Sequence, residues 1–264
     1  MATKLSYFTL SDDVIGPLVD ASVVMVNAVT GYPGSKVKTI EMADTARGTA
    51  TAKLQFTLTS PVAAKFWAIL NHNITAGDPI IRAYTDAGFT TPSGDTITAP
   101  FRVGDIKAYA PSMTPQMYWE VDTSGCSFSD SFFEVGKVVA GTGVHTFAND
   151  YSSFRRGLSY RNILNETIGG TAYAHRIGAR RFSFDLAWNA SKVAPALTEI
   201  LALLELTCGG AYPFLLIPDN DAADFYYVRA SDAAAWQESA ARAYLSGLDL
   251  KAVELSRGKI QVEL

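Results

Sequence analysis

The chain contains very little cysteine, with only Cys126 and Cys208 in 264 residues. Two thiols cannot build a disulfide framework, and isolated thiols in a protein made in a cytosol are usually buried and inert. The sequence does not show whether the two cysteines meet. No Cys or His partner occurs at metal-site spacing, so His72, His145 and His175 are expected to be surface or hydrogen-bonded structural residues.

The sequence also has no long apolar run. No segment approaches the ~18 uninterrupted apolar residues of a membrane span. The first residues, MATKLSYFTLSDD, have no apolar core of the kind that a signal peptide needs. We therefore expect no membrane span, and synthesis in a cytosol without an export signal.

Charge is scarce as well: charged residues make up 18% of the chain and the net charge is −4. Basic residues are scattered, and the nearest approach to a cluster is Arg176 with Arg180 and Arg181. A nucleic-acid-binding protein needs a basic patch to neutralise phosphates, so no nucleic-acid partner is expected. A weakly charged surface suits burial against other proteins, because charged groups are depleted in interface cores.

Recognisable catalytic and cofactor motifs are missing. There is no G-x-S-x-G elbow or defensible Ser-His-Asp order, and the glycines at 141–143 and 169–170 lack the context of a phosphate-binding loop. Paired carboxylates for glycoside cleavage stay open, because separations in space are invisible in a sequence. We expect no enzyme activity, no cofactor, and no catalytic or metal-binding residue.

One acidic loop contains oxygen ligands at a spacing that calcium could use. The loop lacks the glycine and distal glutamate of an EF-hand, so a solvated turn between strands is the favoured interpretation. The residues concerned are Asp219, Asn220, Asp221 and Asp224.

The first half of the chain has the pattern of short strands. In TAKLQFTL (51–58), apolar residues at 52, 54, 56 and 58 alternate with polar ones, which predicts a half-buried antiparallel strand. Turn signals about every ten residues favour a β-sandwich over residues 1–125. The Ser/Gly-rich TSGCSFSDS (123–131) predicts a domain boundary near residue 125. Further strands are predicted at 21–29, 36–42, 79–86, 101–109 and 117–122, with a helical turn or strand at 60–73.

The second half, residues 126–264, is predicted to be another β domain. It opens with a polar, turn-rich stretch, about 137–170, that we interpret as a long irregular arm. In FSFDLAWN (182–189), Phe182, Phe184, Leu186 and Trp188 face one way along an extended chain. Leucines at helical spacing predict an amphipathic helix over about 192–207. With strands at 212–219, 225–230, 248–253 and 259–264, the pattern indicates an antiparallel sheet carrying one helix. We expect the apolar face of 182–189 to pack on that helix and on the 212–219 strand.

The order of these elements resembles a known family. The segments RRFSFDLAWN, ALTEILALLEL, GGAYPFLLIPDN, YYVR and LDLKAVEL, within residues 175–256, resemble the helix-bearing β-sandwich of distal tail and minor tail proteins of long-tailed bacteriophages. The resemblance implies a structural virion protein, a subunit of the ring at the tail tip or baseplate, synthesised in the cytoplasm of the bacterial host. Its partners would be further copies of itself and other tail proteins: tail tube, hub and fibres.

The first half is similar to a second group. KFWAILNHNITAGDPIIRAYTDAG (65–88) resembles the galactose-binding-type jelly roll of phage baseplate and tail-tip proteins. The alternative function is therefore a carbohydrate-binding module or adhesin for host surface glycans, with Trp67 and His72 as the region to test. Aromatic residues in polar stretches could stack on a sugar, anchor a protein interface, or simply pack at strand ends. These are Tyr109, Tyr118, Tyr151, Phe154, Tyr160 and Tyr173.

The arm leads to a prediction about assembly. We expect that deleting residues 141–170 would leave both sandwiches folded and abolish assembly, because the arm would reach onto neighbouring subunits.

Overall fold

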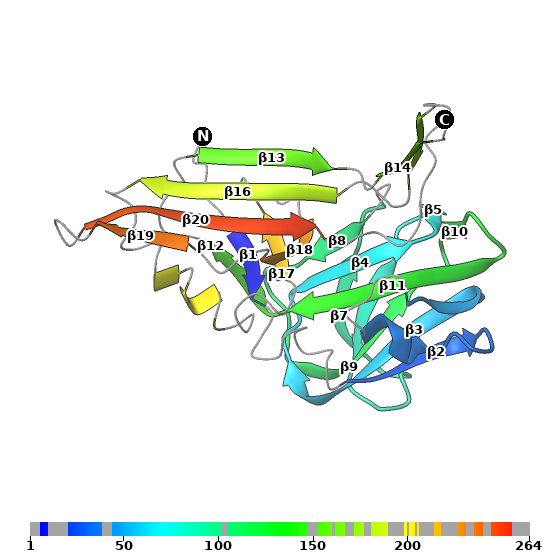
Figure 1. Cartoon of the computed structure of the whole chain (residues 1–264). Helices are drawn as coiled ribbons and strands as arrows, with labels where there is room; N and C mark the ends of the chain where they lie inside the picture. The colour runs from blue at the N-terminus through cyan, green and yellow to red at the C-terminus, as the bar shows by residue number, and fades with distance from the viewer. Residues whose placement is uncertain are drawn as a thin grey trace. The chain divides into compact units, whose positions relative to one another are not determined.

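The structure is a computed structural model of the whole chain, and strands dominate it (Figure 1). The predicted mainly-β class is confirmed. The chain divides into two compact units, one of residues Phe8–Gly143 and one of Met1–Tyr7 with Val144–Leu264. The first is called the sandwich unit below, and the second the C-terminal unit. The described residues are 6–9, 21–38, 44–101, 105–146, 153–159, 162–166, 172–176, 181–189, 198–199, 201–203, 205, 214–217, 226–230, 235–239 and 244–254.

The sandwich unit is an antiparallel sheet that folds over on itself. Its strand order is β7-β6-β9-β3-β11-β4-β8, with β2 also paired to β3, and β5 pairs with β10 in a small separate sheet. The elements are β2 (Ser22–Ala28), a 3-10 helix η2 (Gly34–Lys38), β3 (Ala46–Val62), β4 (Phe66–His72), β5 (Ile74–Ala76), β6 (Ile80–Tyr84), β7 (Pro92–Thr98), β8 (Ile106–Tyr109), β9 (Gln116–Asp122), β10 (Ser127–Phe128) and β11 (Phe132–Gly141).

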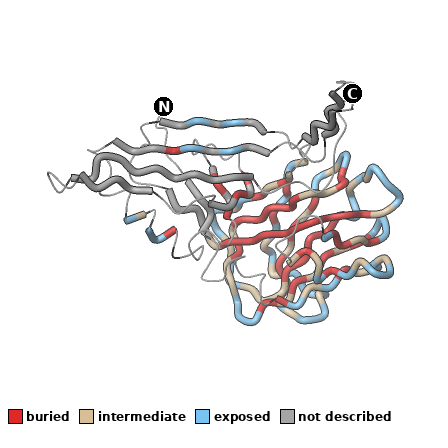
Figure 2. The backbone as a smooth tube through the Cα atoms, viewed as in Figure 1, coloured by how far each residue is buried: buried red, intermediate tan, exposed pale blue. Residues whose placement is uncertain are grey.

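The long strand β3 belongs to both halves of this sheet. Its residues 46–49 pair with β11, whereas residues 53–62 pair with β9. The halves enclose the core, where the Trp67 ring on β4 lies 5.5 Å from that of Trp119 on β9 and 5.6 Å from that of Phe56 on β3. Figure 2 shows the buried residues concentrated along these strands. Because each aromatic side chain removes about 150–250 Å² from water, this cluster dominates the packing energy of the unit.

The predicted alternation in TAKLQFTL is confirmed. Leu54 and Phe56 are fully buried, while Lys53 and Gln55, which alternate with them, are half-buried on the opposite face. The segment at 36–42 differs from its prediction as a strand, since Lys36 to Lys38 lie in η2 and the rest is outside the described residues. The segment at 60–73, predicted as a helical turn or strand, forms the end of β3 and all of β4.

The division between the units lies at residue 143, not near residue 125. The Ser/Gly-rich passage that suggested a linker is fastened to the sandwich unit, because β10 pairs with β5 and the Ser129 N–H donates to the Asn73 carbonyl at 2.9 Å. β11 follows it and pairs with both β3 and β4. Strand β11 is buried from Phe133 to Gly141 on both faces, so it lacks the alternation that marks a half-exposed strand.

The C-terminal unit contains one larger sheet, in the order β12-β1-β17-β18-β20-β16-β13, with β19 also paired to β20. A hairpin of β14 and β15 forms a separate two-stranded sheet. The strands are β1 (Ser6–Thr9), β12 (Gly143–Thr146), β13 (Ser153–Ser159), β14 (Asn162–Glu166), β15 (Ala172–Arg176), β16 (Arg181–Asn189), β17 (Phe214–Ile217), β18 (Tyr226–Ala230), β19 (Ala235–Ser239) and β20 (Tyr244–Glu254).

The stretch expected to be an irregular arm, about 137–170, is largely strand in its described part. It includes the end of β11, β12, β13 and β14, and β13 pairs with β16 along its whole length. Deleting residues 141–170 would therefore remove two strands of the larger sheet, β12 and β13, together with β14 of the hairpin. We replace the expectation that both units would survive that deletion with the expectation that the C-terminal unit would lose its fold.

The described buried side chains of the larger sheet are apolar, and the prediction for FSFDLAWN is confirmed at Leu186, while the side chains of Phe182, Phe184 and Trp188 lie outside the described part. Leu186 is buried, whereas Ser183 and Asp185 on the same strand are exposed. Strand β17 is a member of this sheet, separated from β16 by β18 and β20, so it extends the apolar face of β16 and does not cover it. The other described buried residues of the sheet are Phe214, Leu216, Tyr226 and Val228.

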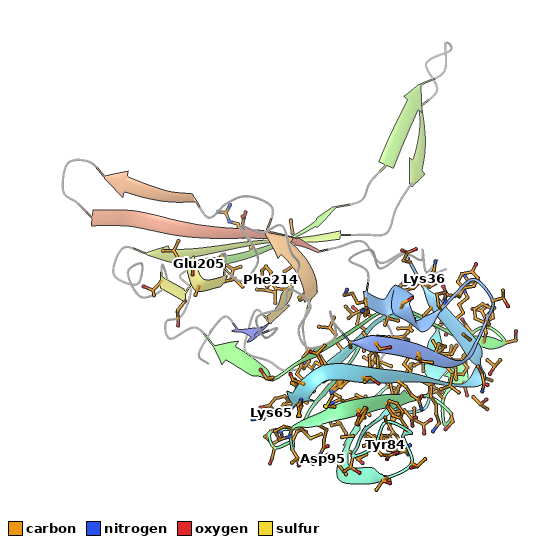
Figure 3. The ribbon with its side chains drawn as sticks, turned by 90° about the horizontal axis from the view of Figure 1, so that it is seen from below. Lys36, Lys65, Tyr84, Asp95, Glu205 and Phe214 are labelled. Carbon is orange, nitrogen blue, oxygen red and sulfur yellow. The ribbon has the colours of Figure 1, made fainter. Side chains whose placement is uncertain are left out.

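The predicted helix is present in the described part of its span. Residues 198–199, 201–203 and 205 are helical, and the rest of 192–207 lies outside the described residues. Leu203 is 1% exposed and Leu201 is 39% exposed, as an amphipathic helix requires. Glu205 and Phe214, labelled in Figure 3, belong to this helical segment and to β17.

The two units are related by insertion. Strands β1 and β12 are hydrogen-bonded neighbours in the C-terminal sheet, yet nearly the whole sandwich unit separates them in sequence. The C-terminal unit is therefore built from both ends of the chain. In the sequence, the sandwich unit is the segment that connects β1 to β12.

Candidate functional site

A polar cluster lies on the face of the sandwich unit that is turned away from the core. Register places Gln55 opposite Glu120 and Glu120 opposite Arg82 on adjacent strands, so their side chains share one face. Core residues such as Phe56 and Trp119 occupy the other face. The β3–β6–β9 cluster, as we name it, consists of Lys53, Gln55, Arg82, Tyr84, Glu120 and Asp122.

Glu120 is the buried centre of this cluster, with 2% of its surface exposed. Its carboxylate accepts hydrogen bonds from Lys53 Nζ at 3.0 Å, Gln55 Nε2 at 2.9 Å and the Tyr84 hydroxyl at 3.1 Å. A buried carboxylate is costly unless it is paired and hydrogen-bonded, and these three donors meet that requirement. Burial, followed by the charge of Glu120, raises the pKa of Tyr84, so the phenol stays protonated and donates.

Asp122 binds both cations of the cluster through one oxygen. Its Oδ2 lies 2.6 Å from Arg82 Nη1 and 3.4 Å from Lys53 Nζ, and its Oδ1 accepts from the Ser124 N–H at 3.0 Å. Burial by itself raises the pKa of Asp122, but the hydrogen bonds from Ser124 and Arg82 and the charge of Lys53 outweigh it and lower the pKa to about 2. The carboxylate is therefore ionised at every physiological pH.

Aromatic rings stand beside the cluster. The Phe89 ring packs edge-on against Tyr84 at 5.5 Å and against Tyr118 at 6.0 Å between centroids. Phe89 has a φ of 53°, which is an unusual conformation for a bulky residue. We call Tyr84, Phe89 and Tyr118 the aromatic wall.

The loop that carries Phe89 is held in shape by Asp86. The carboxylate of Asp86 accepts hydrogen bonds from the backbone N–H groups of Gly88, Thr90 and Thr91, the last at 2.6 Å. The hydrogen bond from Thr91 is the main cause that lowers the pKa of Asp86. These hydrogen bonds hold the loop, and with it Phe89, in one conformation.

The positive and negative side chains of the cluster differ in how far they are exposed to solvent. The side chains of Lys53 and Arg82 are 33% and 30% exposed, whereas those of Glu120 and Asp122 are 2% and 8% exposed. The two buried carboxylates, which we call the floor of the cluster, are neutralised by Lys53 and Arg82, and these two cations reach solvent. Such a face can donate hydrogen bonds from its two cations and present an aromatic ring beside them.

Within the described residues, no group of three or more His, Cys, Asp or Glu side chains could hold a metal ion. A search of the same part of the chain finds no helix that is long and apolar enough to span a membrane. The acidic loop at Asp219, Asn220, Asp221 and Asp224 lies outside the described residues.

The structure changes the interpretation of the region around Trp67 and His72. Trp67 is 1% exposed, and its indole N–H donates to the Ala64 carbonyl at 3.2 Å, so it is a core residue, and naming it as part of the region to test for glycan binding was wrong. His72 is half-buried, and its Nδ1 accepts from the Ile74 N–H at 3.1 Å, which is a structural role. The side chains of His145 and His175 lie outside the description.

The aromatic residues that the sequence suggested for binding differ in exposure, and some of them lie outside the described part of the chain. Tyr109 is 51% exposed, and Tyr118 is half-buried in the aromatic wall. Tyr151 and Tyr160 lie outside the described residues. For Phe154 and Tyr173 only the backbone is described.

Cys126 behaves as an unreactive thiol. It is half-buried, and burial, followed by the charges of Asp78 and Asp122, raises the pKa of its thiol to about 11. The thiolate, which is the nucleophile, is therefore scarce at neutral pH. Cys208 lies outside the described residues.

Sequence reasoning missed most of the cluster. Its signal was the polar side of three alternating strands, which places Lys53 and Gln55 on one face of β3 and Glu120 and Asp122 on one face of β9. The alternation indicates a face for each strand, but it does not show that β3, β9 and β6 are neighbours. Only the strand order brings the three polar faces together.

Comparison with known proteins finds no matching family model and no matching curated protein. Among solved structures, the family 32 carbohydrate-binding module of C. perfringens NanJ, in complex with galactose, matches at 11% identity and a TM-score of 0.40, over 53% of this chain and 99% of that one. The lectin domain of lectinolysin, complexed with Lewis b antigen, matches at 7% identity and a TM-score of 0.38, over 48% of this chain and 96% of that one. Its His 62 mutant matches at 7% identity and a TM-score of 0.37. We draw no functional argument from likenesses at this level.

Proposed function

We propose that the sandwich unit is a non-catalytic carbohydrate-binding module. The observation that carries the proposal is the combination, on one face, of a polar floor with exposed cations and an adjacent aromatic wall. Sugars present hydroxyl groups to hydrogen-bonding side chains and C–H faces to aromatic rings, and binding sites combine these two kinds of group.

The cluster would bind a sugar by presenting fixed donors. Glu120 and Asp122 hold Lys53 and Arg82 through short contacts, so these long side chains lose less conformational entropy on binding than free ones would. Hydroxyl oxygens of the sugar would accept from the two cations. The ring of Tyr118 or Phe89 would cover one face of the sugar.

The proposal is tested by removing one ring. Tyr118→Ala should weaken binding to a panel of host-surface polysaccharides by about tenfold or more, since an aromatic contact at a binding site contributes about 1–3 kcal/mol. The matched control is Tyr109→Ala, which removes an exposed tyrosine from β8, outside this face. Calorimetry would measure affinity and circular dichroism the fold. Equal binding by the Tyr118 variant, the Tyr109 variant and the parent chain would contradict the proposed site.

We propose a second function for the C-terminal unit, namely assembly into a ring at the tail tip or baseplate of a long-tailed phage. The resemblance over residues 175–256 supports it, and so does the sheet itself, whose end strands β12 and β13 each have one partner among the described strands. Unpaired edges are templates for pairing with another chain. A closed ring needs two different patches per subunit, and two different edges meet that need.

The ring proposal has a direct test in the size of the purified chain. Light scattering should show closed oligomers of one size, and imaging of particles should place the chain at the tail tip. A chain that stays monomeric at all concentrations and never enters particles would contradict the assembly role and leave the glycan proposal standing.

A further inference from the structure

In the β3–β6–β9 cluster the cations are more exposed than the acids, and this difference decides which ligand charge the face attracts. The two cations and two anions cancel in number, but they are not equally placed. A ligand that approaches from solvent meets Lys53 and Arg82 first, because their side chains are about a third exposed while both acids are buried. Coulomb energy falls with distance, so the nearer cations dominate the interaction.

The two cations also converge. Lys53 Nζ and Arg82 Nη1 contact the same oxygen, Oδ2 of Asp122, at 3.4 and 2.6 Å. Two donors that share one acceptor oxygen are necessarily close neighbours. A second carboxylate, arriving from the solvent side, would be within reach of both.

The strands that flank the cluster add no acid to its face. Register places Val24 and Val26 of β2 beside Gln55 and Lys53, and Thr96 and Thr98 of β7 beside Arg82 and Ile80. Asp86, in the loop of the aromatic wall, uses its carboxylate on the backbone of its own loop. Tyr118 completes the face on β9, next to Glu120. On the cluster's face of the described strands β2, β3, β6, β7 and β9, the charges that reach solvent are therefore positive, and the nearby solvent-accessible acid is Asp86 in the loop after β6.

We propose that this face selects a sugar that carries a carboxylate, such as a uronic acid. The inference rests on the proposed glycan-binding function and narrows it to a class of ligand. The carboxylate lies across Lys53 and Arg82, and the sugar ring packs on the aromatic wall. Charge-assisted hydrogen bonds to such a pair are stronger than those to a neutral hydroxyl.

The decisive experiment compares oligogalacturonides with the same oligosaccharides after chemical reduction of their carboxylates to alcohols. Calorimetry on the full chain should show binding to the acidic form that is at least about tenfold tighter, because charge-assisted hydrogen bonds are stronger than those to a neutral hydroxyl. The preference should shrink as salt is raised, since half-exposed charges are screened. Polyglutamate serves as a polyanion without sugar rings, and it should bind much more weakly than the oligogalacturonides.

The variants keep hydrogen-bond partners for the buried carboxylates of Glu120 and Asp122. Lys53→Gln leaves Gln55 and Tyr84 as donors to Glu120, and Arg82 and Ser124 as partners of Asp122, so the fold should survive. It should lower the acid-over-neutral preference by about tenfold, whereas Lys65→Gln, between β3 and β4, should leave it unchanged. Thermal unfolding of each variant checks the fold.

The outcomes separate the two proposals. Equal affinity for acidic and reduced sugars, or a preference that Lys53→Gln leaves intact, would overturn the acidic-sugar inference and leave glycan binding in place. Failure to bind any sugar, neutral or acidic, or equal binding of polyglutamate, would overturn the glycan-binding function itself.

Discussion

At the residue scale, the most unusual side chain is Lys137. It lies on β11 with 0% of its surface exposed, and its Nζ donates to the Lys38 carbonyl at 3.3 Å. Burial lowers the pKa of this ammonium from 10.5 to about 7. A lysine in such a position costs stability whenever it is charged.

Lys137 therefore makes stability depend on pH. Between about pH 7 and pH 10.5 the unfolded chain binds a proton at this lysine that the folded chain has released, so this residue's contribution to stability rises with pH across that window. Lys137→Met should remove that slope and raise the free energy of unfolding near pH 7 by about 1–3 kcal/mol.

Urea unfolding at pH 7 and pH 9 measures both effects. Lys36→Met is the control, because the side chain of Lys36 is 31% exposed. If the Lys137 variant kept the parent's pH slope, the penalty would have to lie elsewhere.

Individual residues also show where sequence reasoning succeeds. The alternation in 51–58 correctly separated the buried Leu54 and Phe56 from Lys53 and Gln55, because strand periodicity is a local property. Trp67 was misjudged because it lies on β4, whose residues from Phe66 to Leu70 are all buried, so alternation carried no information there. A tryptophan in such a strand is indistinguishable in sequence from one on a binding surface.

At the element scale, β13 ends the larger sheet, and its outer edge either faces solvent or pairs with a neighbouring chain. Along an edge strand, successive N–H groups point alternately into the sheet and outward, so prolines at adjacent positions have opposite effects. Of Arg155→Pro and Arg156→Pro, one should break pairing with β16 and unfold the C-terminal unit. The other should leave the fold intact and block the addition of a neighbouring chain, which would convert ring oligomers to monomers.

Circular dichroism and light scattering on the two proline variants distinguish these outcomes. A folded variant that still forms the parent's oligomer would show that β13 is not the contact. Arg155 is exposed and lies opposite Asp185 in the register, so loss of its side chain is a small effect by itself.

Strand pairing also explains why the stretch at about 137–170 was wrongly expected to be an irregular arm. Strands β12, β13 and β14 come from a polar, glycine-containing stretch with little local strand signal. β13 is a strand because β16 supplies its partners along its whole length. Pairing between distant segments overrides weak local preference, which is the usual way that a sheet escapes sequence prediction.

At the scale of the whole molecule, the insertion predicts two separable parts. Residues 8–143 expressed alone should fold cooperatively, because their core and sheet pairings are internal to that unit. Replacement of residues 10–142 by a short Gly/Ser linker should leave a folded C-terminal unit, since β1 and β12 are adjacent strands.

Calorimetric unfolding of the two products tests this. The isolated sandwich unit should keep the glycan affinity of the full chain, and the linked C-terminal unit should keep its oligomeric state. Loss of folding in the isolated sandwich unit would mean that its core depends on the rest of the chain.

The sequence alone determined the mainly-β class, the core alternation of β3, the two-faced β16 and the helix that follows it, because each depends on periodicity within a single segment. It also excluded a cysteine framework and a basic nucleic-acid surface, which are matters of composition. The tertiary structure decided which strands are neighbours, and with that the insertion of one unit between β1 and β12 and the meeting of Lys53, Arg82 and Asp122 on one face. Those depend on hydrogen bonds between residues far apart in the chain, and a one-dimensional pattern does not specify which strand pairs with which.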